Sequence, residues 1–164
     1  MACPNYKIAN HNMFISETII DSVVEALEQV DFEQEITNFT EEHPVLIEYW
    51  GAEDFALLTQ DERELMLYVL LVLVKSVEKA KGKLPPLSSE SLENAEEKNW
   101  ERLDNVTAKR FRDRMDIFFD NYPQEDLLAF VEDNLVEDED SIVTKEGREP
   151  MFVALKSVID VISQ

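Results

Sequence analysis

The sequence has little cysteine, glycine or proline, and each shortage excludes a class of protein. Its single cysteine, Cys3, cannot form a disulfide within the chain, so an oxidising compartment gains no support. Three dispersed glycines cannot supply Gly-x-x-x-x-Gly-Lys or Gly-x-Gly-x-x-Gly, which excludes both phosphate-binding loops. The Gly-x-Ser-x-Gly turn of serine hydrolases is missing too. Few glycines and six prolines also leave little material for tight β-turns, which favours helices.

Histidine is nearly as scarce, because the chain holds only His11 and His43. Carboxylate-bridged di-metal bundles use Glu-x-x-His pairs, but Ile8 and Thr40 stand three residues before the two histidines. We therefore interpret both as surface or partly buried side chains. The sequence predicts no cofactor, no metal site and no catalytic residue.

Basic residues are outnumbered, with 15 Lys and Arg against 36 Asp and Glu and a net charge of -21. Residues 1–60 hold 12 acids and one base, residues 61–114 hold 11 of each, and residues 115–164 hold 13 acids and three bases. Two acidic ends around a balanced middle favour a basic partner. They argue against a nucleic-acid or anionic-membrane surface.

Long apolar runs are also missing. The longest, Leu65–Val74, is half of the roughly 20 residues that a membrane span needs, and Glu64 and Lys75 bound it. The N-terminus lacks the basic and apolar regions of a signal peptide. We expect a cytoplasmic protein.

What the sequence does contain is helical periodicity. Thr59 to Glu62 form a capping box ahead of the Leu65–Val74 run, which predicts a buried helix over about 60–81. Another helix is expected from about Ser89 through Tyr122, with a break or bend at 105–107. A last helix is expected to open at Glu149 and Pro150.

These patterns predict a single all-α domain over residues 1–164. We expect a bundle of about six helices around the central helix at roughly 60–81. The Pro/Ser-rich stretch at 83–91 predicts an exposed loop, and residues 1–14 predict a mobile N-terminus.

Two carboxylate clusters in the sequence are candidate metal sites. Asp113, Asp116 and Asp120 share one side of a predicted helix, but neighbouring arginines favour local ion pairs, such as Arg112 with Asp116. The loop at 137–141 places Asp138, Asp140 and Glu149 at EF-hand positions one, three and twelve. However, Ile142 and Val143 stand where an oxygen ligand and a glycine are needed.

Candidate interaction residues are the aromatic pair Tyr49 and Trp50 and the acidic loop Glu137, Asp138, Glu139 and Asp140. The one basic cluster, residues 109–114, is expected to pair with acids inside the molecule, because the net charge opposes a polyanion.

Charge and the absence of catalytic motifs lead to two hypotheses. The first is a noncatalytic protein-interaction module that docks a basic partner, with self-association left open. The alternative is an enzyme whose site consists of carboxylates and a divalent metal. A pocket in which carboxylates converge would favour the alternative.

Overall fold

The structure, a computed structural model, describes residues 13–136 and 138–164. Within these ranges it is all-helical, as predicted, but it contains eight α-helices where about six were expected. The elements are α1 (Glu17–Glu28), α2 (Phe32–Glu42), α3 (Pro44–Trp50), the 3-10 turn η2 (Glu53–Phe55), α4 (Gln60–Lys81), α5 (Ser89–Asp104), α6 (Phe111–Phe119), α7 (Glu125–Leu135) and α8 (Lys145–Ile162).

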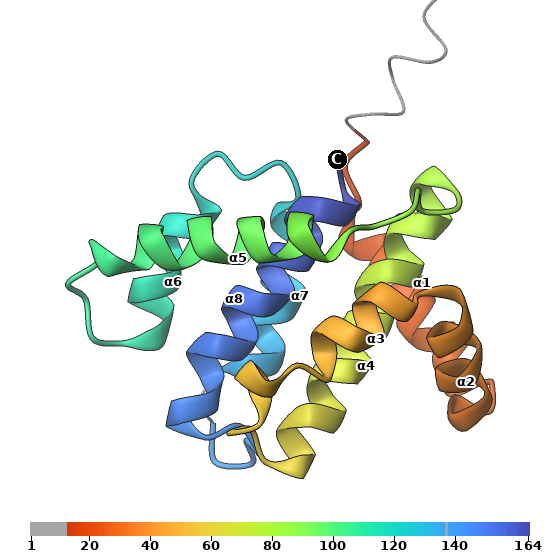
Figure 1. Cartoon of the computed structure of the whole chain (residues 1–164), viewed down its shortest axis with the longest axis horizontal. Helices are drawn as coiled ribbons and strands as arrows, with labels where there is room; N and C mark the ends of the chain where they lie inside the picture. The colour runs from red at the N-terminus through yellow and green to blue at the C-terminus, as the bar shows by residue number, and fades with distance from the viewer. Residues whose placement is uncertain (1–12, 137) are drawn as a thin grey trace, which may run out of the picture.

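Two helices form the centre of the bundle. The helix predicted at 60–81 is confirmed as α4, and ten of its 22 residues are buried. Helix α8 is buried still more, with twelve of its 18 residues inside. It packs against α4, α5 and α7, and α5 lies across it (Figure 1). The C-terminal helix is therefore as central as the one that the sequence pointed to.

The helix predicted from Ser89 to Tyr122 is divided into α5 and α6 by a turn at 105–110, which confirms the expected break at 105–107, and the second helix ends at Phe119. The guanidinium of Arg114 donates to the carbonyls of Val106 and Ala108, at 3.1 and 3.0 Å, and so satisfies backbone groups that the turn exposes. The reversal lets Leu103 of α5 and Phe118 of α6 enter the same core.

Helix α8 begins at Lys145, four residues before the predicted start at Glu149. Its N-cap is Thr144, whose hydroxyl accepts from the N–H of Gly147 at 3.0 Å and donates to Glu62 of α4 at 3.1 Å. Glu62 also accepts from the N–H of Thr59 in the predicted capping box, which is confirmed. A Cβ on residue 147 would collide with the Glu62 carboxylate, so glycine is needed there.

Two further segments are the connection before α5 and the N-terminal stretch. Residues 82–88 connect α4 to α5, and Ser88 caps α5, so the helix takes the last positions of the stretch expected to be a loop. Of the predicted mobile N-terminus, residues 1–12 lie outside the described residues. At Met13 the backbone carbonyl accepts from Gln124 Nε2 at 2.9 Å.

Candidate functional site

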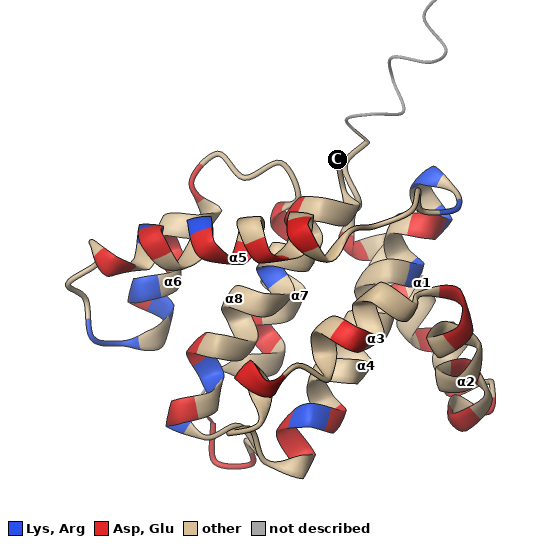
Figure 2. Cartoon of the chain, in the orientation of Figure 1, with Lys and Arg blue, Asp and Glu red and all other residues tan. Residues whose placement is uncertain are grey.

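The strongest candidate site is a hollow of about 490 Å³ beside η2, α5 and Pro150 of α8. We call it the acidic hollow. Its described lining includes four carboxylates and no lysine or arginine, and the acids of α5 are visible along that helix in Figure 2. The lining residues are Asp54, Phe55, Glu93, Glu96, Glu97, Trp100 and Pro150.

Helical spacing brings most of this lining together. Glu93, Glu96, Glu97 and Trp100 stand at positions i, i+3, i+4 and i+7 of α5, which places them on one face. The buried residues of α5, Leu92, Asn99 and Leu103, lie about a quarter turn around the helix from this face. Glu96 and Trp100, on the side nearer the core, are therefore partly buried, whereas Glu93 and Glu97 are exposed.

The 3-10 turn supplies the fourth carboxylate. Asp54 is exposed, while its neighbour Phe55 is only 3% exposed and anchors the turn. The Phe55 ring packs edge-on against Tyr49, with the ring centroids 5.6 Å apart. Tyr49 in turn contacts α5, so this chain of contacts sets Asp54 beside the acids of α5.

Glu96 is the best-ordered carboxylate of the hollow. One of its oxygens accepts from the Tyr49 hydroxyl at 3.0 Å, and the other accepts from Trp100 Nε1 at 3.4 Å. Partial burial raises the pKa of Glu96; the two hydrogen bonds oppose that rise, while the charges of Asp54 and Glu93 add to it. Burial and the Glu96 charge raise the pKa of Tyr49 as well, so the phenol stays a donor.

The acids of the hollow do not converge on one point as metal ligands do. Among the described residues, one group of three or more His, Cys, Asp or Glu has its ligand atoms all within 4.8 Å of one another, and that group is Glu42, His43 and Glu78. The acids of the hollow do not form such a group. A guanidinium or ammonium can satisfy several separated carboxylates and can also stack on an indole ring, which Trp100 offers.

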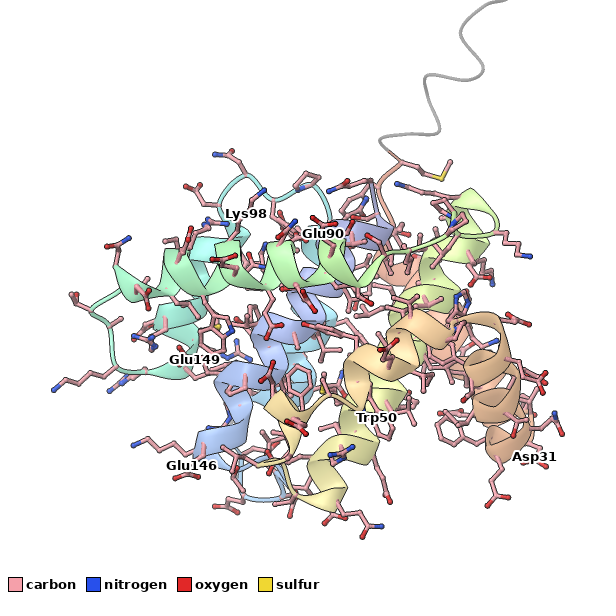
Figure 3. All side chains as sticks on the ribbon, in the orientation of Figure 1. Asp31, Trp50, Glu90, Lys98, Glu146 and Glu149 are labelled. Atoms are coloured by element: carbon pink, nitrogen blue, oxygen red, sulfur yellow. The ribbon has the colours of Figure 1, made fainter. Side chains whose placement is uncertain are left out.

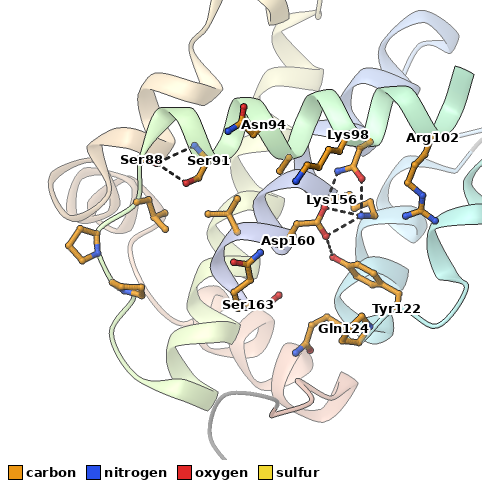
Figure 4. A pocket seen from close by; sticks show the side chains of 18 residues that line it. Ser88, Ser91, Asn94, Lys98, Arg102, Tyr122, Gln124, Lys156, Asp160 and Ser163 are labelled. Atoms are coloured by element: carbon orange, nitrogen blue, oxygen red, sulfur yellow. Dashed lines mark hydrogen bonds and ion pairs between the residues drawn. The ribbon is translucent and has the colours of Figure 1, made fainter.

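A larger groove, of about 1080 Å³, lies along the seam between α5 and the end of α8 (Figure 4). The ammonium of Lys156 is buried there and donates to Asn99 Oδ1 at 2.9 Å and to Asp160 Oδ2 at 2.9 Å. The Tyr122 hydroxyl donates to Asp160 Oδ1 at 2.6 Å, and Asn99 Nδ2 donates to Ser157 Oγ at 3.0 Å. We call these five residues the Lys156 seam.

A buried lysine invites a catalytic interpretation, because burial lowers the pKa of Lys156 while Asp160 partly restores it. However, the N–H groups of this ammonium already donate hydrogen bonds to oxygens of Asn99 and Asp160. The rings of Phe118 and Tyr122 lie 5.1 and 4.7 Å from the nitrogen. Such an ammonium has no proton or lone pair directed at a substrate. The geometry is that of a polar joint between two helices.

The two aromatic residues predicted as interaction candidates, Tyr49 and Trp50, contact different parts of the fold. Trp50 is partly buried, donates its Nε1–H to the Arg63 carbonyl at 2.9 Å and lies under the Arg63 guanidinium (Figure 3). Tyr49 instead donates a hydrogen bond to Glu96, so it helps to hold that residue of the acidic hollow in place.

In the predicted acidic loop Asp138, Glu139 and Asp140 are exposed, and Asp138 accepts from the Asp140 N–H at 2.9 Å. Glu137 lies outside the described residues.

The alternative carboxylate cluster does not converge. Asp113, Asp116 and Asp120 are all exposed, and of the three only Asp113 is among the described residues that line a second, largely basic hollow at the start of α6. Two residues of the basic cluster pair with acids of other helices inside the molecule, as predicted for the cluster: Arg114 Nη2 lies 2.8 Å from Glu149, and Arg112 lies 3.6 Å from Asp133.

Sequence reasoning did not single out Glu93, Glu96 or Glu97. Their spacing on α5 is also that of any solvated helix face, and the distinguishing element, Asp54 on η2, comes from 39 residues earlier in the chain. The signal that was available is Trp100, an aromatic residue on the same face as three acids.

No protein-family model matches the chain, and neither a curated protein nor a solved structure was found to be similar to it. Over residues 13–136 and 138–164, none of the helices has the length and apolar character needed to cross a bilayer.

Proposed function

We propose that this protein is a noncatalytic docking module that binds a basic segment of a partner protein in the acidic hollow. The observation that carries the proposal is a concave site with four carboxylates, an indole ring and no cation in its described lining. The Lys156 seam and the basic cluster at 109–114 contain ion pairs. The described lining of the hollow contains no cation, and a lysine or arginine of a partner would supply one.

Three features support a role in binding over a role in solubility alone. Glu96 is held in place by Tyr49 and Trp100, so its orientation is set before a ligand arrives, which lowers the entropy cost of binding. Trp100 gives a face on which a guanidinium can stack. The acidic surroundings accelerate the approach of a basic partner.

The alternative, a carboxylate-based enzyme, has one observation in its favour, the raised pKa of the partly buried Glu96. Both oxygens of that carboxylate already accept hydrogen bonds from Tyr49 and Trp100. The docking role uses the fixed acceptor as it stands, whereas proton transfer to a substrate would require these bonds to break. We therefore prefer docking.

The test uses fluorescently labelled hexa-arginine and hexa-lysine peptides and measures anisotropy at low and high salt. Glu93→Gln with Glu97→Gln removes two charges from the hollow. Two matched variants remove the same charge elsewhere: Asp21→Asn with Glu25→Gln on α1, and Asp138→Asn with Asp140→Asn in the acidic loop.

We expect the hollow variant to weaken binding about tenfold and the α1 variant much less. Hexa-arginine should bind more tightly than hexa-lysine because of stacking on Trp100. Equal weakening by all three variants would mean that net charge alone attracts the peptide, and the hollow would lose its role. A dominant loss in the loop variant would move the site to residues 138–140.

The cytoplasm remains part of this proposal. Its support is the single cysteine, which permits no disulfide within the chain.

A further inference from the structure

A second site lies at the corner between α2 and α3, where it faces α4. His43 ends α2 and begins α3, because Pro44 has no N–H to continue the first helix. The imidazole Nε2 lies 2.9 Å from Glu78 Oε1 on α4 and 3.9 Å from Glu42 Oε2. One ligand atom from each of these three residues falls within 4.8 Å of the others.

The imidazole of this cluster is largely enclosed, whereas the Glu42 side chain is exposed. The cluster borders a hollow of about 200 Å³ with apolar walls that include Phe39, Leu71 and Val74. The His43 side chain is only 10% exposed, and its ring packs against Phe39 with centroids 5.0 Å apart. The packing fixes the direction of the ring nitrogen, which a metal ligand requires.

One cation, Lys75, also lines this hollow. Its ammonium lies 2.7 Å from the Glu35 carboxylate, so its charge is already matched. The carboxylates of Glu42 and Glu78 lie outside that ion pair. Two negative charges and one imidazole are thus available at the corner.

We propose that Glu42, His43 and Glu78 bind a divalent transition-metal ion, with Zn²⁺ as the best fit. Zinc accepts nitrogen and carboxylate oxygen at about 2.0 to 2.2 Å in a tetrahedral arrangement, which separates neighbouring ligand atoms by roughly 3.3 to 3.6 Å. The two distances from His43 Nε2, 2.9 and 3.9 Å, lie on either side of that range, so shifts of a few tenths of an ångström bring each carboxylate to the required distance from the imidazole. The ligand atoms of Glu42 and Glu78 lie within 4.8 Å of each other. Water in the adjacent hollow supplies the fourth ligand.

The imidazole decides the class of metal. Magnesium and calcium prefer sites made of oxygen alone, whereas imidazole suits zinc, copper and nickel. The ion would tie the α2–α3 corner to α4 by three coordination bonds in place of the single His43–Glu78 contact. This site shares no residue with the acidic hollow and does not depend on the proposed function.

The test is titration of the untagged full chain with ZnCl₂ by calorimetry and with CoCl₂ by absorption, since tetrahedral cobalt has intense visible bands. We expect one ion per chain and a higher melting temperature with zinc. His43→Gln and Glu78→Gln should each weaken binding by about 10- to 100-fold or more. His11→Gln, which removes the only other histidine, and Glu41→Gln serve as matched controls.

Two results would overturn the proposal. One is the absence of stoichiometric binding by the wild-type chain. The other is binding that His43→Gln leaves unchanged, which would make the corner a simple His43–Glu78 ion pair. Should His43→Gln fail to fold by circular dichroism, Glu42→Gln decides the matter, because Glu42 is 63% exposed and its loss does not open the core.

Discussion

Two tyrosine–carboxylate pairs in this molecule have nearly the same local chemistry and opposite surroundings. In the Lys156 seam Tyr122 donates to Asp160, and in the acidic hollow Tyr49 donates to Glu96. Burial and the adjacent carboxylate raise the pKa of both phenols. The difference is that Asp160 has the Lys156 ammonium 2.9 Å away, whereas Glu96 has Asp54 and Glu93 as charged neighbours.

This contrast separates a charge that is paired inside the fold from a charge that has no cation beside it. The partly buried Asp160 carboxylate and the buried Lys156 ammonium compensate each other, and removing either one leaves the other unpaired. Glu96 accepts hydrogen bonds from Tyr49 and Trp100, but its charged neighbours are other carboxylates. A cation from outside the chain would compensate them, and this difference underlies the proposed docking role.

The largest effect is expected from Asp160→Asn, which leaves the buried Lys156 without its counter-charge. We expect a loss of about 3 kcal/mol in the free energy of unfolding, measured by urea denaturation. Asp21→Asn, on the exposed face of α1, removes the same charge and should change stability little. A loss below about 1 kcal/mol for Asp160→Asn would mean that water solvates the seam.

A smaller effect is expected when each tyrosine loses its hydroxyl. Tyr122→Phe should cost about 2 kcal/mol, because the hydrogen bond goes to a charged acceptor inside the seam. Tyr49→Phe should cost less, since water in the hollow can replace the phenol at Glu96. Paired thermal and urea melts of the two variants would show the order, and equal costs would contradict the distinction between the two sites.

Asp54→Lys places a cation in the acidic hollow, so that the hollow comes to resemble the Lys156 seam. Its effect on stability should be small, about 0.5 kcal/mol, because the residue is exposed. Binding of hexa-arginine should nevertheless fall more than in a variant that neutralises Asp54 alone, Asp54→Asn, because the new ammonium occupies the place of the ligand. Unchanged binding would show that Asp54 lies outside the binding surface.

The smallest effect is a pH dependence that belongs to Glu96. Because its pKa is higher in the folded chain than the ordinary value of 4.5, the folded state holds this proton more tightly. The contribution to stability is full below pH 4.5 and is lost as pH rises through the folded pKa. Subtracting the unfolding free energies of Glu96→Gln from those of the wild type, from pH 4 upward, should isolate this decline; a difference independent of pH would contradict it.

The sequence predicted those elements whose signals are local. The capping box from Thr59 to Glu62 defined the start of α4 because both partners lie within four residues. The start of α8 also has a local signal, since the Thr144 hydroxyl accepts from the N–H of Gly147, but the prediction placed Pro150 in the first turn and so began the helix four residues late. Only the contact of Thr144 with Glu62, 82 residues earlier, depends on the fold. The turn at 105–110 was expected only as a break, because the support from Arg114 depends on the fold-back itself.

The sites follow the same rule. Lys156 and Asp160 are an i,i+4 pair that the sequence displays, but their importance comes from Asn99 and Tyr122 on other segments. For Tyr49 the sequence indicated an interaction surface, and the structure places it as the support of Glu96. The hollow exists because the fold brings Asp54 and Pro150 beside the acidic face of α5, and helical periodicity does not indicate such contacts between distant segments.

Glu62 has a consequence for how the molecule opens. One buried carboxylate accepts from the N–H of Thr59 at the start of α4 and from the hydroxyl of Thr144 at the start of α8, so the two first turns share a hydrogen-bond acceptor. The amide protons of the two first turns should therefore exchange with solvent as one cooperative unit. Positions 62 and 147 are coupled in the same way: a glutamate at 62 requires glycine at 147, and a larger residue at 147 is compatible only with a shorter one at 62.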